Sequence, residues 1–261
     1  MARVKPTMVL DLDNTLVYAH TDMVAGSDFT MERAGEESPL FIMKRPGVDA
    51  FLKRISKVFR LVVFSAGVEE YVNFVVDHLD PAKTMIWKKL HSGHCKIDEG
   101  TKFKDLGFAD REFRGVDLKR LVALDDLVDF YAKEYRENVV RAEKFEGSPG
   151  DCFLQGLAPF LLALAKLPDF RRAIVCYNNG ECKEMNGRVY IKDAFDDSWV
   201  DASLMLQRIN PQNRELGLWV GWSAYQQQSS GDRDAQHSRE GSCGAREEIP
   251  PSEDHRSREE P

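Results

Sequence analysis

The sequence has no excess of basic residues, few cysteines and no long apolar run. It carries 36 Lys and Arg against 43 Asp and Glu, a formal net charge of −7. A domain that binds nucleic acid by neutralising phosphates is normally basic, so no direct nucleic-acid partner is expected. No stretch of about 18 apolar residues occurs, so neither a transmembrane helix nor a membrane partner is predicted. The five cysteines are scattered and odd in number, which predicts free thiols in a reducing compartment, nuclear or cytoplasmic.

Apolar side chains are scarcest at the end of the chain, in residues 223–261. This segment holds one aromatic residue, Tyr225, and one large aliphatic residue, Ile249. Such a composition cannot bury enough apolar surface to offset the entropy lost on ordering. We therefore predict a disordered polar tail from 223 to 261. The chain as a whole is 43% hydrophobic, so residues 1–222 have enough apolar side chains for a folded core.

The first two thirds of the chain alternate apolar strands with amphipathic helices. Strands are predicted at residues 9–10, 59–64 and 121–124, and apolar residues at helical spacing predict helices at 48–58 and 68–79. Strand, polar loop and helix in this order are typical of a parallel α/β sheet. Further expectations are a surface loop at 19–39, strands at 41–43 and 139–140, a short β insertion at 84–103, a helix at 152–167, a hairpin within 173–191 and a helix at 201–209.

Polar side chains follow three of these apolar strands directly. Asp11 and Asp13 follow the first, Ser65 the second, and Asp125 with Asp126 the third. Each residue alone is most simply a turn or helix-capping residue. The carboxyl ends of strands in a parallel sheet meet at one crevice, where ligands bind. The joint pattern therefore predicts a single site built from all five residues.

Two carboxylates at this position can divide the work of a reaction. Alternation along an extended segment places Asp11 and Asp13 on the same side of the chain. One carboxylate can attack an electrophile while the other gives or takes a proton. A cluster of carboxylates also attracts a hard cation, above all Mg²⁺. The sequence thus favours a magnesium-dependent reaction at a phosphorus centre.

Five segments between Met8 and Leu167 carry a family resemblance. They are DLDNTLV, KRPGVDAFLKR, VVFSAGVEEYV, GTKFKDL and LVALDD. In order and spacing they resemble the haloacid-dehalogenase-type phosphatases, and more narrowly the small C-terminal-domain phosphatases of the NLI-interacting-factor-like family. The resemblance implies a Rossmann-like three-layer sandwich with a central parallel sheet and no large cap domain. It places a phosphatase domain at residues 1–167, followed by an extension of uncertain structure at 168–222.

The resemblance also assigns roles to residues. Asp11 would be the nucleophile that forms an aspartyl-phosphate, and Asp13 the general acid and base, with its backbone carbonyl on the metal. Ser65, Ala66 and Lys104 would bind the substrate phosphate, with Ser65 standing where the family usually has Thr. Asp126 would bind Mg²⁺ directly, and Asp125 would support it. These roles complete the predicted site: Asp11 and Asp13 as catalytic residues, Ser65, Ala66 and Lys104 on phosphate, and Asp11, Asp13, Asp125 and Asp126 around the metal.

The resemblance implies a monomeric phosphatase acting on phosphoserine or phosphothreonine of a protein, of which the C-terminal domain of RNA polymerase II is one example. The family's substrate preference does not carry over, because many relatives have a substrate-reading arginine near the position of Ser92. Two alternatives stay open: a phosphatase-like module that binds proteins without catalysis, and a small-molecule phosphatase. His91, His94 and Cys95 allow a structural zinc site, which is the weaker interpretation because a fourth ligand is missing.

Overall fold

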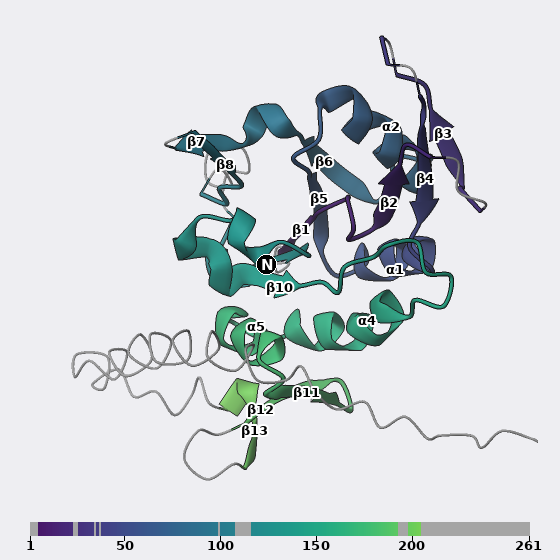
Figure 1. The fold of residues 1–261 in the computed structure, drawn as a ribbon. Coiled ribbons are helices and arrows are strands. Elements are labelled where there is room, and N and C mark those ends of the chain that lie inside the picture. The colour runs from purple at the N-terminus through teal and green to yellow at the C-terminus, as the bar shows by residue number, and fades with distance from the viewer. Residues whose placement is uncertain are drawn as a thin grey trace, which may run out of the picture. The chain divides into compact units, whose positions relative to one another are not determined.

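The core of the protein is a five-stranded sheet in which all strands run parallel. A computed structural model describes residues 5–22, 26–33, 35–36, 38–98, 100–107, 116–192 and 198–204. The strand order is β10-β9-β1-β5-β6 (Figure 1). These strands span Val139–Arg141, Leu121–Asp125, Thr7–Leu10, Arg60–Phe64 and Ile86–Leu90. The predicted parallel α/β sheet is therefore confirmed.

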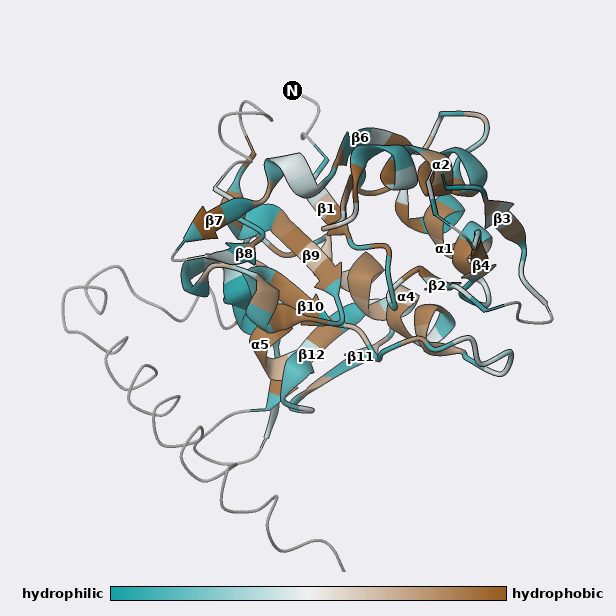
Figure 2. Cartoon of the chain, turned by 45° about the horizontal axis from the view of Figure 1, so that its top comes forward, coloured by the Kyte–Doolittle hydropathy of each residue, from teal (hydrophilic) through white to brown (hydrophobic). Residues whose placement is uncertain are grey.

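The two faces of the sheet are covered by different kinds of structure. Met8 and Leu10 of β1 belong to a core shared with residues of α1, α2, α4 and α5, which span Val48–Ile55, Glu69–Leu79, Phe153–Leu164 and Arg171–Asn178. Val9, on the opposite face, packs with Tyr131 and Leu106. On this face lie the 3₁₀ helices η2 (Leu118–Arg120), η3 (Val128–Phe130) and η4 (Lys133–Asn138). Figure 2 shows apolar residues concentrated in strands such as β9 and β10 and in α4.

The expected β insertion is shorter than predicted, because its first part belongs to the central sheet. Strand β6 pairs in parallel with β5, and Leu90 is buried on the face of Val9. The 3₁₀ helix η1 (Ser92–His94) follows, then an antiparallel hairpin of β7 (Lys96–Asp98) and β8 (Thr101–Phe103). The prediction of a hairpin is right for residues 96–103 and wrong for 86–90.

The expected surface loop at 19–39 is also partly wrong. A small antiparallel sheet, in the order β2-β4-β3, takes up part of it. Its strands span Val17–His20, Leu40–Lys44 and Phe29–Met31. Met31 and Ile42 are buried in the main core. Val17 is buried in the same core, and Ala19, Phe29 and Leu40 pack against it, so apolar side chains fix these strands within a segment whose average composition is polar.

The chain beyond α4 packs onto the same core. The predicted hairpin exists as β11 (Cys182–Met185) and β12 (Arg188–Lys192), joined at Asn186-Gly187 with positive φ at both residues, and β13 (Trp199–Asp201) pairs with β12. The earlier Asn179-Gly180 pair follows helix α5, so residues 173–178 are helical and not a strand. Phe170 and Ile191 lie in the core shared with β1.

Some expectations are not decided by this structure. The tail at 223–261 and most of the helix expected at 201–209 lie outside the described residues, and the domain boundaries at 167 and 222 stay predictions. Within the described ranges, no helix is both long and apolar enough to cross a membrane.

Candidate active site

The segment after β1 turns sharply and brings its acids to the carboxyl edge of the sheet. Asn14 has φ 58°, a left-handed conformation that Asn tolerates better than most residues. The amides of Thr15 and Leu16 then donate to the carbonyl of Leu12 at 3.2 and 2.9 Å. The Asn14 side chain donates to the carbonyl of Phe145 at 2.9 Å, and the amide of Phe145 donates back to Asn14 at 2.7 Å. These bonds fix the loop that carries Asp11 and Asp13.

Lys104 lies between two of the predicted acids. Its Nζ atom donates to Oδ1 of Asp11 at 2.7 Å and to Oδ2 of Asp125 at 2.6 Å, and the Lys104 side chain is 2% exposed. Backbone hydrogen bonds to Phe130 and Ala132, at 2.8 and 3.2 Å, hold Lys104 in place. The sheet and the end of the insertion thus converge on one buried cation.

The charges around Lys104 are strongly coupled. Burial raises the pKa of Asp11 to about 8, with Asp125 and Asp13 adding to the rise and Lys104 opposing it. Burial lowers the pKa of Lys104, but its two carboxylate partners outweigh burial and raise it overall. Lys104 therefore stays cationic. The site holds more acidic than basic groups, so a further cation would offset the repulsion among the acids.

Asp13 faces a different set of groups from Asp11. Its Oδ2 atom accepts a hydrogen bond from the Ser65 hydroxyl at 3.2 Å, and its Oδ1 atom accepts one from the hydroxyl of Tyr71. Burial raises the pKa of Asp13, and the bonds from Tyr71 and Ser65 oppose the rise. The Ser65 hydroxyl also accepts the amide of Gly67 at 3.0 Å. Ala66, between them, is exposed at the surface of this loop.

Three carboxylates are close enough to share one ion. Oxygen atoms of Asp11, Asp125 and Asp126 all lie within 4.8 Å of one another. Carboxylate oxygens are the donors that Mg²⁺ prefers, so these residues fit the predicted metal. The Asp13 side chain lies outside this group and points toward Tyr71. A contribution of Asp13 to the metal would have to come from its backbone carbonyl, as the resemblance implies.

Two residues of the site were missed by sequence reasoning. The Thr15 hydroxyl accepts the amide of Asp126 at 3.2 Å and donates to its Oδ1 at 3.4 Å. Thr15 continues the alternation of Asp11 and Asp13, so the spacing could have pointed to it. Tyr71 belongs to the helix predicted at 68–79, and its ring is buried in the core. Nothing in the sequence indicates that its hydroxyl reaches Asp13.

The histidines after β6 have structural partners. Nδ1 of His91 accepts the amide of Gly93 at 3.2 Å, and Nδ1 of His94 accepts the amide of His91 at 3.2 Å. These bonds cap η1. Among the described residues, the cluster suited to a metal ion consists of the three aspartates and includes neither histidine.

The sequence of this chain is similar to those of known phosphatases. A profile of the NLI interacting factor-like phosphatases matches residues 6–171. The chain belongs to this family. It is 33% identical over 177 residues to CTD nuclear envelope phosphatase 1B of Danio rerio, covering 64% of this chain and 70% of that protein. It is 30% identical over 171 residues to Nuclear envelope morphology protein 1 of Schizosaccharomyces pombe, covering 64% of this chain and 35% of that protein.

Solved structures of the RNA polymerase II CTD phosphatase Fcp1 are similar in part. One overlaps with a TM-score of 0.44 at 22% identity, covering 56% of this chain and 44% of Fcp1. Membership in the NLI interacting factor-like family supports protein phosphatase activity for this chain. The family predicted from the sequence motifs is confirmed.

Proposed function

We propose that this protein removes phosphate from phosphoserine or phosphothreonine of a protein substrate through a phosphorylated Asp11. The observation that carries the proposal is the position of Lys104 between Asp11 and Asp125, with Asp13 held beside them by Ser65 and Tyr71. A nucleophile, a proton-transfer group and a buried cation are thereby gathered at one edge of the sheet.

In the first half-reaction, ionised Asp11 attacks phosphorus through a carboxylate oxygen; the charge of Lys104, and that of a bound metal, would favour ionisation against the burial that raises its pKa. Within the described part of the chain, Lys104 is the side chain that bonds to Asp11, and it uses Oδ1. Oδ2 is therefore available for the attack. The phosphorus–oxygen bond to the substrate serine breaks as the new bond forms, and Asp13 gives its proton to the departing oxygen. The raised pKa of Asp13 favours the protonated form that this step needs.

In the second half-reaction, Asp13 takes a proton from water. The water oxygen attacks phosphorus, the bond to Asp11 breaks, and inorganic phosphate leaves. The hydrogen bonds from Ser65 and Tyr71 stabilise the ionised Asp13 that this step needs. Lys104, the Ser65 hydroxyl and the loop at Ala66 are placed to hold phosphate oxygens, and the lysine cation stabilises charge on the transferring group.

Asp11, Asp125 and Asp126 would hold Mg²⁺, together with the carbonyl of Asp13. When bound, the metal supplies positive charge that offsets the repulsion among these acids and polarises a phosphate oxygen. Asp125 contacts Lys104 directly, so its role is shared between the lysine and the metal. Thr15 orients Asp126 through its two hydrogen bonds.

We propose that the substrate is a phosphoprotein and that the enzyme is a monomer, which itself binds neither nucleic acid nor a membrane. We also propose that it acts in the nucleus or the cytoplasm. The name of the Danio rerio relative attaches that protein to the nuclear envelope. The phosphatase domain would be residues 1–167, with 168–222 as an extension and 223–261 as a tail.

The direct test is hydrolysis of p-nitrophenyl phosphate and of phosphopeptides in the presence of Mg²⁺. Wild type should turn over both, and Asp11→Asn should turn over neither. Asp13→Asn should retain phosphopeptide binding while turnover slows, so captured proteins would identify substrates. Equal, very slow hydrolysis by wild type and Asp11→Asn would contradict the proposal. A set of metabolite phosphates hydrolysed faster than every phosphopeptide would favour a small-molecule phosphatase instead.

A further inference from the structure

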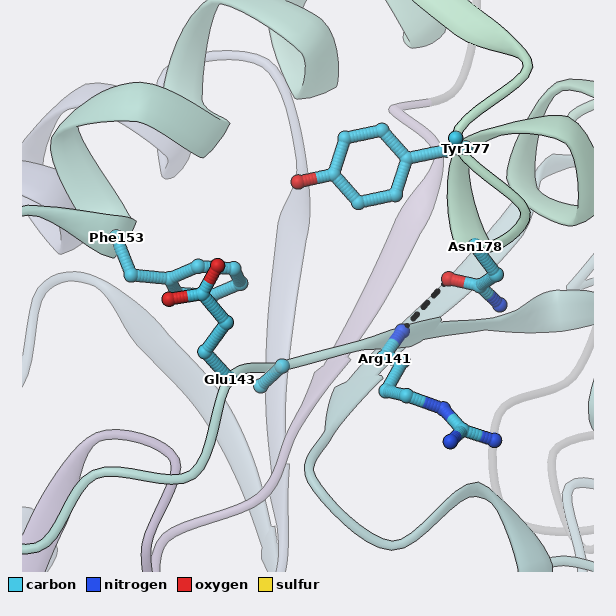
Figure 3. Close-up of a pocket in the computed structure, with 7 residues that line it drawn as sticks. Arg141, Glu143, Phe153, Tyr177 and Asn178 are labelled. Atoms are coloured by element: carbon cyan, nitrogen blue, oxygen red, sulfur yellow. Dashed lines mark hydrogen bonds between the residues drawn. The ribbon is translucent and has the colours of Figure 1, made fainter. Parts of the chain in front are cut away.

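A groove with a volume of about 390 Å³ lies at the carboxyl end of β10, next to the strand that carries Asp125 (Figure 3). Its lining comes from the end of β10, the start of α4 and the end of α5, and includes Arg141, Glu143, Phe153 and Tyr177. The groove lies at the edge of the sheet that β10 forms. The proposed reaction does not use the groove.

The groove begins one strand away from the acids of the metal cluster. Arg141 is the register partner of Asp125, and the amide of Ala142 donates to the Asp125 carbonyl at 2.9 Å. Neighbouring strands lie about 4.8 Å apart, and Glu143 follows two residues beyond Arg141. A substrate chain advances about 3.4 Å per residue when extended. A side chain about two to four residues from the phosphorylated residue can therefore reach Glu143.

The chemistry of the groove suits a cation. Glu143 is exposed, and among the described residues no cation forms an ion pair with it. Figure 3 shows its carboxylate beside the ring of Phe153, with the hydroxyl of Tyr177 directed toward both. Burial, followed by the charge of Glu143, raises the pKa of Tyr177, which agrees with a short separation of the two groups. A carboxylate close to aromatic rings is an arrangement that attracts ammonium and guanidinium groups.

The other polar groups do not oppose this. The amide of Arg141 donates to Oδ1 of Asn178 at 2.9 Å, and the Arg141 guanidinium extends away from Glu143 (Figure 3). The guanidinium of Arg45 lies 4.5 Å from the centre of the Phe153 ring, and its charge is offset by the ion pair with Asp151 at 2.7 Å, so Glu143 keeps its own charge available. An anionic side chain would be repelled by Glu143, and an apolar one would remove water from that carboxylate without replacing its hydrogen bonds.

We propose that this groove binds a lysine or arginine side chain of the phosphoprotein substrate, two to four residues from the phosphorylated serine or threonine. The inference rests on the proposed phosphatase function and adds a sequence preference to it. Glu143 supplies the charge, and the rings of Phe153 and Tyr177 supply the walls.

The experiment uses the full chain and phosphoserine peptides that are polyalanine apart from one lysine, placed in turn from four residues before to four residues after the phosphoserine. The quantity measured is the ratio of kcat/KM for each lysine peptide to that for the all-alanine peptide. At one or two positions the ratio should be about five to ten, the size expected for an exposed ion pair combined with a cation–π contact. Glu143→Gln should reduce the ratio to about two. Tyr177→Phe should keep the preference, and Tyr177→Leu should weaken it.

Glu134→Gln is the matched control, because Glu134 is an exposed acid on η4 outside the groove. This variant should retain the full ratio. Equal kcat/KM for all peptides, or a preference that survives Glu143→Gln unchanged, would overturn the inference. Hydrolysis of p-nitrophenyl phosphate by wild type is scored separately. If wild type fails there and on every peptide, the proposed function has failed, whereas activity without a lysine preference contradicts the groove assignment alone.

Discussion

The hydroxyl of Tyr71 donates a hydrogen bond to Oδ1 of Asp13, while Ser65 donates to Oδ2 of the same carboxylate. Two donors on one acid stabilise its ionised form, in opposition to burial, which favours the protonated form. In the proposed reaction Asp13 must be protonated in one half and ionised in the other. Tyr71 is therefore a positioning residue that adjusts the balance between the two forms.

Replacing Tyr71 by Phe should raise the pKa of Asp13, because the lost bond stabilised the carboxylate. Less Asp13 would then be ionised at a given acidic pH. The acidic limb of the kcat profile for p-nitrophenyl phosphate should move up by roughly one pH unit, from a hydrogen bond to a charged group. This substrate isolates the base role of Asp13, since nitrophenolate departs without protonation. Tyr18→Phe, in a half-buried tyrosine of β2, is the control, and identical profiles for Tyr71→Phe and wild type would contradict the assignment.

Replacing Lys104 by Met should lower both the catalytic rate and the free energy of unfolding. Catalysis should fall at least about 100-fold with the loss of charge at the transferring phosphoryl group. Two buried acids, Asp11 and Asp125, would be left without their cation, at a cost of about 3–5 kcal/mol in the free energy of unfolding. Urea unfolding with and without Mg²⁺ measures the free energy of unfolding, and added Mg²⁺ should recover part of the free energy lost in the variant. Lys102→Met, two residues earlier in β8, should leave activity within about twofold of wild type.

Magnesium should raise the melting temperature of the wild type by mass action, since the ion binds the folded site. Asp126→Ala should abolish the rise, and Thr15→Val should shift the Mg²⁺ dependence to roughly tenfold higher concentration, because it removes the group that orients Asp126. Asp129→Ala changes an exposed acid on η3 and should behave as wild type. A full magnesium response in Asp126→Ala would rule out Asp126 as a metal ligand.

The ion pair of Arg45 and Asp151 should cause part of the decrease in the free energy of unfolding at acidic pH. Arg45 is fully buried and donates from Nε and Nη2 to Asp151 at 2.8 and 2.7 Å, and from Nη1 to the carbonyl of Thr15 at 3.1 Å. The hydrogen bond from Arg45 holds the pKa of Asp151 below its ordinary value despite partial burial. The pair therefore contributes stability above pH ~4, and that stability is lost as pH falls through the lowered pKa.

Asp151→Asn should lower the free energy of unfolding by about 3 kcal/mol at neutral pH, because the buried guanidinium loses its counter-charge. The difference from wild type should begin to shrink below pH ~4, where Asp151 of the unfolded wild-type chain takes up a proton, and should disappear once the pH is below the lowered pKa of the folded state. Urea unfolding midpoints of wild type and Asp151→Asn, measured from neutral pH to below pH ~4, give the difference in stability and its dependence on pH. Asp169→Asn, in a partly exposed pair with Arg171, should cost less than about 1 kcal/mol. A constant difference for Asp151→Asn at all pH values would exclude the linkage.

The sequence was informative where chemistry and periodicity coincide. Acids after apolar strands indicated the carboxyl edge of a parallel sheet, and the structure brings Asp11, Asp125 and Asp126 together there. Strand β6 was missed because IWKKL holds two adjacent lysines and only Leu90 of it is fully buried, so it lacks the continuous apolar run of its pairing partner β5. Helix α5 was missed because the Asn-Gly pair after it is also the commonest turn of a hairpin. Tyr71 and Arg45 depend on contacts between residues far apart in sequence, which no local pattern encodes.

Lys104 is tied through its backbone to Phe130 and Ala132 of the protein body, and the β7–β8 hairpin ends just one residue before it. The hairpin itself contacts this segment through the ion pair of Lys96 with the buried Asp105. If that pair is kept, we expect residues 97–103 to accept a new sequence and a new shape while the ammonium group stays between Asp11 and Asp125. In this architecture the choice of substrate can evolve without changing the reaction.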